Sequence, residues 1–207
     1  MLRGLFISLD GLDGAGKSTQ CRLLAEWLRA RGHVVVACAD PGGTRVGRHI
    51  RQLLLNYDMD LTCEALLFMA SRAQLVAEVI RPALENGQWV VCDRFLLANV
   101  VYQGHAGGLD PERLWTLGRF ATGGLEPDLT VVLDLPLDQA ITRRTRPADR
   151  VEGRASDYQE RVRAGFLAEA RRRPERIHVV DADQPIEVVQ HLIQQEVARV
   201  LAAGSRA

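Results

Sequence analysis

A glycine-rich loop between an apolar run and an amphipathic segment constrains this chain more than any other part of its sequence. Residues 11–18 read Gly-Leu-Asp-Gly-Ala-Gly-Lys-Ser and fit the pattern G-x-x-x-x-G-K-[ST]. The apolar residues 5–9 before the loop predict a buried strand, and residues 17–30 after it carry apolar side chains at helical spacing. Strand, glycine loop and helix, in that order, form the context in which such a loop binds phosphate groups.

Each part of the loop has a physical reason to face a phosphate. Its glycines permit positive φ and leave backbone N–H groups unobstructed, and the following helix adds the partial positive charge of its N-terminus. Lys17 is expected to reach the β- and γ-phosphates, and the Ser18 hydroxyl suits a magnesium ion. The alternative, an ordinary glycine-rich turn, does not require the flanking strand and helix. The predicted ATP site consists of Gly11, Leu12, Asp13, Gly14, Ala15, Gly16, Lys17, Ser18 and Thr19.

The rest of the chain alternates between strand-like and helix-like segments. We expect strands at 5–9, 34–38, 89–92, 129–133 and 177–180, and helices at 17–30, 45–55, 61–84, 110–121, 137–144, 158–172 and 185–202. Such alternation predicts an α/β fold, a five-stranded parallel sheet with helices on both faces. Residues 1–207 are expected to form a single domain. Sites in such sheets lie at the carboxyl ends of the strands.

Charge and hydropathy argue against some classes of partner. Lys plus Arg and Asp plus Glu both number 26, so the formal net charge is zero and gives no reason to expect a nucleic acid or a membrane surface as partner. No stretch of the sequence is long and apolar enough to span a bilayer, and no secretion signal is visible. A cytoplasmic enzyme is the expectation.

Five ordered motifs resemble the thymidylate kinase family, of the bacterial type, and the resemblance covers nearly the whole chain. The phosphate loop is the first, and residues 40–44, Asp-Pro-Gly-Gly-Thr, are similar to the family's Arg-Glu-Pro-Gly-Gly-Thr loop. Residues 67–74 resemble a family helix, and 93–103 resemble the Asp-Arg-Tyr…Ala-Tyr-Gln signature. The fifth motif is an arginine-rich stretch that resembles the family's lid, about residues 143–156. The resemblance implies transfer of the γ-phosphoryl group of MgATP to dTMP, giving dTDP.

The resemblance also assigns roles in an acceptor pocket. Phe68 would stack on thymine and Arg72 would hydrogen-bond its carbonyl edge, whereas spacing alone would place Phe68 in the core. Arg94 would hold the acceptor phosphate, for which its forked geometry is suited; the alternative is a surface ion pair. Asp13 would contact the acceptor's sugar or a cation, or else serve only as a turn former.

The remaining assignments concern the sugar, the base edge and the metal. Asn99 would read the pyrimidine edge, and Tyr102 and Gln103 would line the sugar side, although all three suit a plain helix face as well. Asp40 would belong to the same pocket. Asp93 would hold a magnesium water or orient Arg94, which together with Ser18 gives the predicted magnesium site.

Several arginines lie close together between positions 143 and 154. Charge alone suggests a solvated basic loop. The resemblance implies a lid that places guanidinium groups on the γ-phosphoryl, because the phosphate loop has Gly14-Ala15 where some family members carry an arginine. Arg146 and Arg150 are the predicted catalytic arginines of the lid, alongside Lys17 and Arg94.

Some positions depart from the family pattern. Ala39 stands in place of an arginine, which removes a possible contact to the acceptor phosphate, and Ala98 stands where a serine is common. Two alternatives therefore stay open: a kinase for another pyrimidine nucleotide or deoxynucleoside, and a non-catalytic nucleotide-binding regulator. The family forms homodimers, and the apolar segment 61–84 offers a helix face for one.

Overall fold

The computed structural model describes residues 4–143 and 155–204 and contains a five-stranded sheet in which every strand pair is parallel. The strand order is β2-β3-β1-β4-β5, so the strand that leads into the phosphate loop lies at the centre. The strands are β1 Phe6–Gly11, β2 Val35–Ala39, β3 Trp89–Asp93, β4 Leu129–Asp134 and β5 Ile177–Asp181. All five lie where the sequence predicted them, and the predicted fold class is confirmed.

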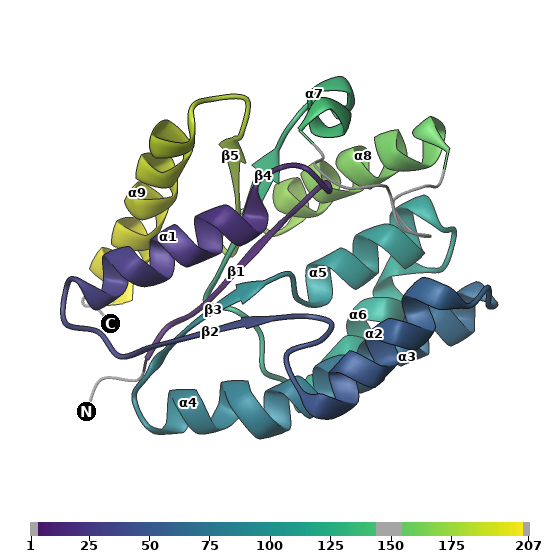
Figure 1. The fold of residues 1–207 in the computed structure, drawn as a ribbon, viewed down its shortest axis with the longest axis horizontal. Helices are drawn as coiled ribbons and strands as arrows, with labels where there is room; N and C mark the ends of the chain where they lie inside the picture. Colours follow the sequence, from purple (N-terminus) through teal and green to yellow (C-terminus); the bar gives the residue numbers. More distant parts are fainter. Residues whose placement is uncertain (1–3, 144–154, 205–207) are drawn as a thin grey trace.

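Helices cover both faces of this sheet (Figure 1). Helices α1 (Lys17–Arg29) and α9 (Ile186–Gly204) pack on one face, and α5 (Leu96–Asn99) and α8 (Ser156–Arg172) pack on the other. The remaining helices of the described residues are α2 Arg45–Asn56, α3 Leu61–Leu75, α4 Arg81–Glu85, α6 Pro111–Thr122 and α7 Leu137–Thr142. Two π-helical segments, η1 Val76–Ile80 and η2 Val100–Ala106, interrupt the α-helical geometry.

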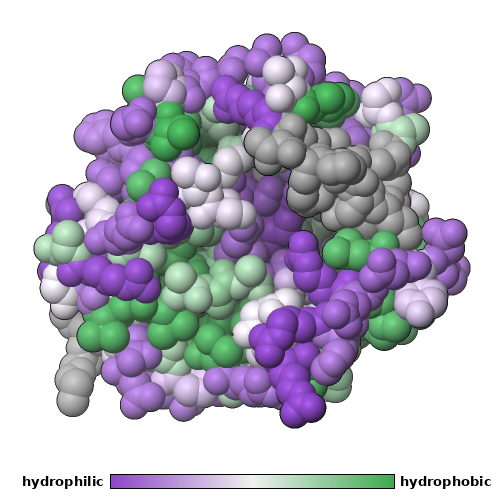
Figure 2. Space-filling model, viewed as in Figure 1, coloured by the Kyte–Doolittle hydropathy of each residue, from purple (hydrophilic) through white to green (hydrophobic). Residues whose placement is uncertain are grey.

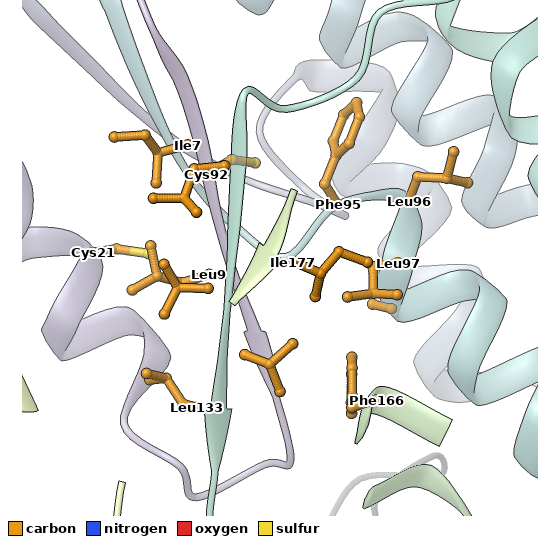
Figure 3. Packing of buried hydrophobic residues seen from close by; sticks show 14 of the residues in the cluster. Ile7, Leu9, Cys21, Cys92, Phe95, Leu96, Leu97, Leu133, Phe166 and Ile177 are labelled. Carbon is orange, nitrogen blue, oxygen red and sulfur yellow. The ribbon is translucent and has the colours of Figure 1, made fainter. Parts of the chain in front are cut away.

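The core lies on both sides of the central strands. Figure 3 shows Leu9 and Cys21 on one side of the sheet and Phe95, Leu97 and Phe166 on the other. Alternate residues of β1 point to opposite faces, so its whole length is buried, as a central parallel strand requires. This double burial explains why the strands read as continuous apolar runs in the sequence.

The predicted long helix 61–84 is present as one helical run that contains a π-helical turn. The π-helical turn Val76–Ile80 separates α3 from α4, and Pro82 lies in the first turn of α4. Proline lacks an N–H to donate and is tolerated in a first turn, so the chain changes its hydrogen-bond pattern just before it. Pro82 therefore lies directly after the π-helical turn, within one helical run.

The described residues contain no helix that is both long and apolar enough to cross a membrane.

Candidate active site

The phosphate loop occupies the carboxyl end of β1 and passes directly into α1. Two of its glycines are fixed by close backbone approaches: a Cβ on Gly11 would lie 2.5 Å from the carbonyl oxygen of Leu133, and one on Gly14 would lie 2.2 Å from that of Ala140. Both have positive φ, 137° and 95°. The loop can take this path only without side chains at these positions.

Lys17 is buried at the end of this loop. Its Nζ donates to the Leu12 carbonyl at 2.8 Å and lies 3.6 Å from Asp13 Oδ1. Burial lowers the pKa of Lys17 below its ordinary value, and the nearby Arg94 acts in the same direction, while Asp13 and Asp93 oppose both. Burial has removed water from the Lys17 ammonium group. The anionic β- and γ-phosphates would compensate for that loss by accepting its hydrogen bonds.

One pocket lies beside the loop and gathers side chains from widely separated segments. Its volume is about 660 Å³ including its open mouth. Figure 2 shows hydrophilic residues inside a hollow near the middle of this face. All eight residues predicted to bind the acceptor line this pocket: Asp13, Asp40, Phe68, Arg72, Arg94, Asn99, Tyr102 and Gln103.

Asp13, Arg94 and Tyr102 form a cluster where the pocket meets the loop. Arg94 Nη2 forms an ion pair with Asp13 Oδ1, and Tyr102 Oη donates to Asp13 Oδ2 at 3.2 Å. Burial disfavours the charged form of Asp13, but Arg94 and Lys17 outweigh it and hold the pKa of that carboxyl well below its usual range. The cluster therefore carries fixed charges of both signs, which a phosphate and a sugar hydroxyl can both use.

Arg94 is held by its backbone as well as by its side chain. It is the one non-glycine residue of the described chain with positive φ, at 70°, and it follows directly after β3. Its N–H donates to the Leu9 carbonyl at 2.9 Å, and its Nη1 donates to the Gly11 carbonyl at 3.3 Å. Strained non-glycine conformations persist where surrounding contacts over-determine them, and here those contacts aim the guanidinium at the pocket.

Arg72 lies on the opposite wall of the pocket and is almost fully buried. Its Nε forms an ion pair with Asp40 Oδ2 at 2.7 Å, and its Nη1 donates to Asn99 Oδ1 at 3.1 Å. Burial raises the pKa of Asp40 above its ordinary value, although Arg72 acts to lower it. These contacts pair the guanidinium group of Arg72 and hold it in one orientation at the pocket wall.

Phe68 is half-buried and lines the pocket together with Leu54 and Leu55. Phe68 is therefore not a core residue, as spacing alone would suggest, because its side chain lines the open space of the pocket. An aromatic face at the edge of a cavity that holds a few polar groups is suited to stack on a planar base.

Sequence reasoning missed some pocket residues. Arg51 on α2 lines the pocket and donates through Nη1 to the Pro41 carbonyl at 3.2 Å. The other lining residues that were not predicted are Pro41, Leu54, Leu55 and Ala98. Helical spacing contained a signal for Arg51, because Leu54 and Leu55 lie three and four residues further along the same helix.

The predicted magnesium site consists of two oxygen-bearing side chains in contact. Ser18 Oγ in the first turn of α1 hydrogen-bonds to Asp93 Oδ2 at the end of β3. Magnesium in nucleotide-binding sites takes one or two protein oxygens and completes its shell with phosphates and water. Ser18 and Asp93 fit that requirement, and within the described residues no set of three His, Cys, Asp or Glu side chains is arranged to hold a metal alone.

Asp10, directly beneath the loop, was not predicted to matter. It is fully buried, and neither carboxylate oxygen has a hydrogen-bond partner within the described residues. Burial raises the pKa of Asp10 to about 7, against the pull of Arg94 and Lys17. Its closeness to Arg94, which is distant in the sequence, is clear only once the fold is known.

The lid lies mostly outside the described residues. Arg146 and Arg150, the predicted catalytic arginines of the lid, both fall in the range 144–154 that the structure does not describe. Arg143, at the beginning of the predicted lid, donates to the Ala182 carbonyl at 2.7 Å and pairs with Asp183 at 3.0 Å.

Comparison with known proteins gives one consistent result. The family model described as thymidylate kinase matches residues 9–193. A thymidylate kinase of Symbiobacterium thermophilum is 47% identical over 201 residues, covering 95% of this chain and 94% of the relative. One of Rhodopirellula baltica is 47% identical over 192 residues, covering 92% and 78%. A crystal structure of thymidylate kinase from Ehrlichia chaffeensis superposes with a TM-score of 0.78 at 30% identity, covering 95% of this chain and 99% of that one.

Proposed function

This chain belongs to the thymidylate kinase family and phosphorylates dTMP to dTDP with ATP as the phosphoryl donor, and we propose that two adjoining parts of one site divide this work. The loop of residues 11–19 holds ATP, and the pocket between Arg72 and Arg94 holds dTMP. One observation carries this division: eight residues assigned to the acceptor from separate motifs line a single pocket that shares Asp13 with the loop.

On the donor side, the loop binds the phosphates mainly through backbone N–H groups and the N-terminus of α1. Lys17 exchanges its contact with the Leu12 carbonyl for the β- and γ-phosphate oxygens. Ser18 and Asp93 would hold Mg²⁺, directly or through water. When bound, Mg²⁺ neutralises charge on the β- and γ-phosphates.

On the acceptor side, the pocket recognises each part of the nucleotide with a different side chain. Phe68 stacks on the thymine ring, while Arg72 and Asn99 address its hydrogen-bonding edge. Tyr102, Gln103 and Asp13 line the sugar. Arg94 holds the acceptor phosphate.

Arg51 is a second cation for the acceptor phosphate. It lines the same pocket, and a side chain there offsets the charge that is missing at Ala39. We include Arg51 in the proposed site because it lines the pocket, although no sequence motif pointed to it.

The phosphoryl transfer needs little covalent chemistry from the protein. An oxygen of the dTMP phosphate is ionised at neutral pH and attacks the γ-phosphorus in line, while the bond to the β-phosphate oxygen of ADP breaks. Lys17 and Arg94 align the reactants and neutralise charge. In our proposal Arg146 and Arg150 of the lid, about residues 143–156, add guanidinium groups on the γ-phosphoryl.

We also propose that the chain is a single kinase domain that works as a cytoplasmic homodimer. Large apolar side chains are exposed on three helices that pack together, α2, α3 and α6: Leu53 at 44%, Leu66 at 49% and Phe120 at 86%. Association of two copies would cover such a patch. Mass measurement in solution tests this, and a monomer at micromolar concentration would contradict it.

An ADP-release assay across nucleoside monophosphates tests the substrate assignment. We expect dTMP to be the preferred acceptor and AMP to be turned over poorly, because a purine does not fit the edge formed by Arg72 and Asn99. Equal rates with dTMP and AMP would contradict the proposed pocket.

A further inference from the structure

A continuous chain of buried polar side chains runs behind the proposed base site. Gln103 Nε2 donates to Glu64 Oε1 at 2.8 Å, and Asn99 Nδ2 donates to Gln103 Oε1 at 2.7 Å. Arg72 Nη1 donates to Asn99 Oδ1 at 3.1 Å, and Arg72 is paired with Asp40. Glu64, at the far end, is 0% exposed and lies on α3 outside the pocket lining.

The two ends of this chain fix the direction of every link. A carboxylate only accepts hydrogen bonds, and a guanidinium only donates them. Glu64 therefore requires the N–H side of the Gln103 amide, which turns Gln103 Oε1 toward Asn99. Asn99 must then present its own N–H to Gln103 and its oxygen to Arg72, which is the orientation that Arg72 also requires.

Reversal of the Asn99 amide would be penalised at two places. If Gln103 turned with it, the Gln103 oxygen would face the Glu64 carboxylate, acceptor against acceptor. The Asn99 NH₂ group would face the Arg72 guanidinium, donor against donor. Buried polar groups without partners are costly, so Glu64 acts on Asn99 although the two residues do not touch.

The fixed orientation has a consequence for base recognition. It places a donor, Arg72, beside an acceptor, Asn99 Oδ1. Thymine offers the complementary pair along its edge, the O4 acceptor and the N3–H donor. Cytosine offers a 4-amino donor and an N3 acceptor, which is the reverse. A turned Asn99 would lose the acceptor that N3–H needs and would gain a donor that suits cytosine N3.

We propose that Glu64 is a positioning residue that sets thymine-over-cytosine selectivity by locking the Asn99 amide through Gln103. This inference rests on the proposed function, in which Arg72 and Asn99 meet the base edge. It adds a residue that is not itself part of the pocket lining and is 35 positions from Asn99 in the sequence.

The test is the variant Glu64→Gln, measured as kcat/KM for dTMP, dUMP and dCMP. A glutamine keeps the shape but accepts and donates equally well, so it no longer penalises the turned amides. We expect the dTMP-to-dCMP ratio to fall about tenfold, mainly through a higher KM for dTMP, with part of the selectivity kept by Arg72. The dTMP-to-dUMP ratio should stay the same, because uracil and thymine share this edge.

Glu169→Gln is the matched control. Glu169 is also 0% exposed and joins helices by accepting from Trp115 Nε1 at 3.1 Å and from Arg172 Nη1 at 2.9 Å, but it is not part of the pocket. It should lower the thermal unfolding temperature while leaving the dTMP-to-dCMP ratio unchanged. An equal fall of that ratio in both variants would overturn the proposal.

Two further variants separate the possible failures. If Glu64→Gln does not fold, Gln103→Met removes the same relay at similar volume and should lower the same ratio, since dTMP and dCMP share one sugar. If Asn99→Ala abolishes the selectivity but neither relay variant changes it, the role of Glu64 is wrong. If Asn99→Ala leaves the selectivity intact, the proposed base contact itself is wrong.

Discussion

The phosphate loop and the acceptor pocket adjoin each other but are built in opposite ways. The loop is a contiguous segment whose shape depends on glycines and backbone groups, as the close approaches at Gly11 and Gly14 show. The pocket consists of side chains from the β1–α1 and β2–α2 loops, from Arg94 after β3, and from α2, α3 and α5–η2, held by ion pairs and amide hydrogen bonds. In our proposal ATP is thus bound by a local structure, and dTMP by the tertiary fold.

Because of this difference, the phosphate loop and the acceptor pocket differ in how well they can distinguish one nucleotide from another. Backbone N–H groups bind any triphosphate, because the phosphates are common to all nucleotides. Selectivity for the acceptor needs side chains of fixed orientation, and fixing them takes buried partners, such as Asp40 for Arg72. Substitutions on the two sides should therefore fail in different ways.

The largest effect is expected for Lys17→Ala, because Lys17 is the one side chain on which the loop depends for charge. It is also the only lysine among the 26 basic residues of the chain. We expect kcat/KM to fall by about 10³, within the range known for removing a preorganised charge from a transition state, with little change in dTMP affinity. Steady-state kinetics and dTMP titration in the absence of ATP measure the two effects.

Arg22→Ala is the control for Lys17→Ala. Arg22 lies on the same helix, is exposed, and forms a surface pair with Glu26, which contributes little. It should leave kcat/KM near the unsubstituted value. If Lys17→Ala weakened dTMP binding as strongly as it slowed turnover, the loop and the acceptor pocket would not bind their substrates independently.

Asp40→Asn should show the opposite behaviour, a loss of stability on the acceptor side. It removes the charge opposite a guanidinium group whose side chain is only 2% exposed. Breaking a buried pair from one side typically costs 3–5 kcal/mol, and we expect about 3 kcal/mol of unfolding free energy because Asn99 and the Phe95 carbonyl still accept from Arg72. Denaturant unfolding measures it.

Asp134→Asn provides the comparison for Asp40→Asn. Asp134 pairs with Arg163 at 2.7 Å, but the two side chains are 21% and 31% exposed. We expect a loss of at most about 1 kcal/mol. Equal losses in the two variants would show that burial of the Asp40–Arg72 pair is not what stabilises the pocket.

Most of the fold was predictable because its signals are local. The five strands were found as apolar runs bounded by turns, and α2 begins after Thr44, which caps it by accepting from the Gly47 N–H at 2.9 Å. The segment 96–106 was not recognised as helical. It is buried almost throughout, so it lacks the solvent-exposed polar face by which a helix is usually identified, although Asn99, Tyr102 and Gln103 repeat at helical spacing.

The site was predictable to the extent that motifs encode it. The residues predicted for the acceptor from separate motifs, with Asp13 of the loop among them, line one pocket, while their roles stay predictions. The relay from Glu64 to Asn99 and the position of Arg51 were not foreseen. They depend on which face of α2, α3 and η2 meets which neighbour, and no local pattern specifies that.

The smallest expected effect concerns Asp10, which lies beside the phosphate loop on the donor side of the site. Asp40 and Asp10 are both buried carboxyl groups, but Asp40 has Arg72 as a close partner, and Asp10 has no hydrogen-bond partner within the described residues. Burial raises the pKa of Asp10 from 3.8 to about 7 in the folded protein. Between these pH values the folded state holds a proton that the unfolded state has lost, so stability falls as the pH rises from about 4 to about 7.

Asp10→Asn removes this titration and should flatten the pH dependence. Relative to the variant, the unsubstituted protein should lose on the order of 2 kcal/mol of unfolding free energy between pH 5 and pH 8, since each pKa unit corresponds to about 1.4 kcal/mol. Denaturant unfolding without nucleotide at pH 5, 6.5 and 8 measures this, with the exposed Asp58→Asn as control. A pH-independent difference between the two proteins would mean that Asp10 stays ionised beneath the loop. Lys17 and Arg94 would then suffice to hold a buried charge there, and the donor side would resemble the paired acceptor side after all.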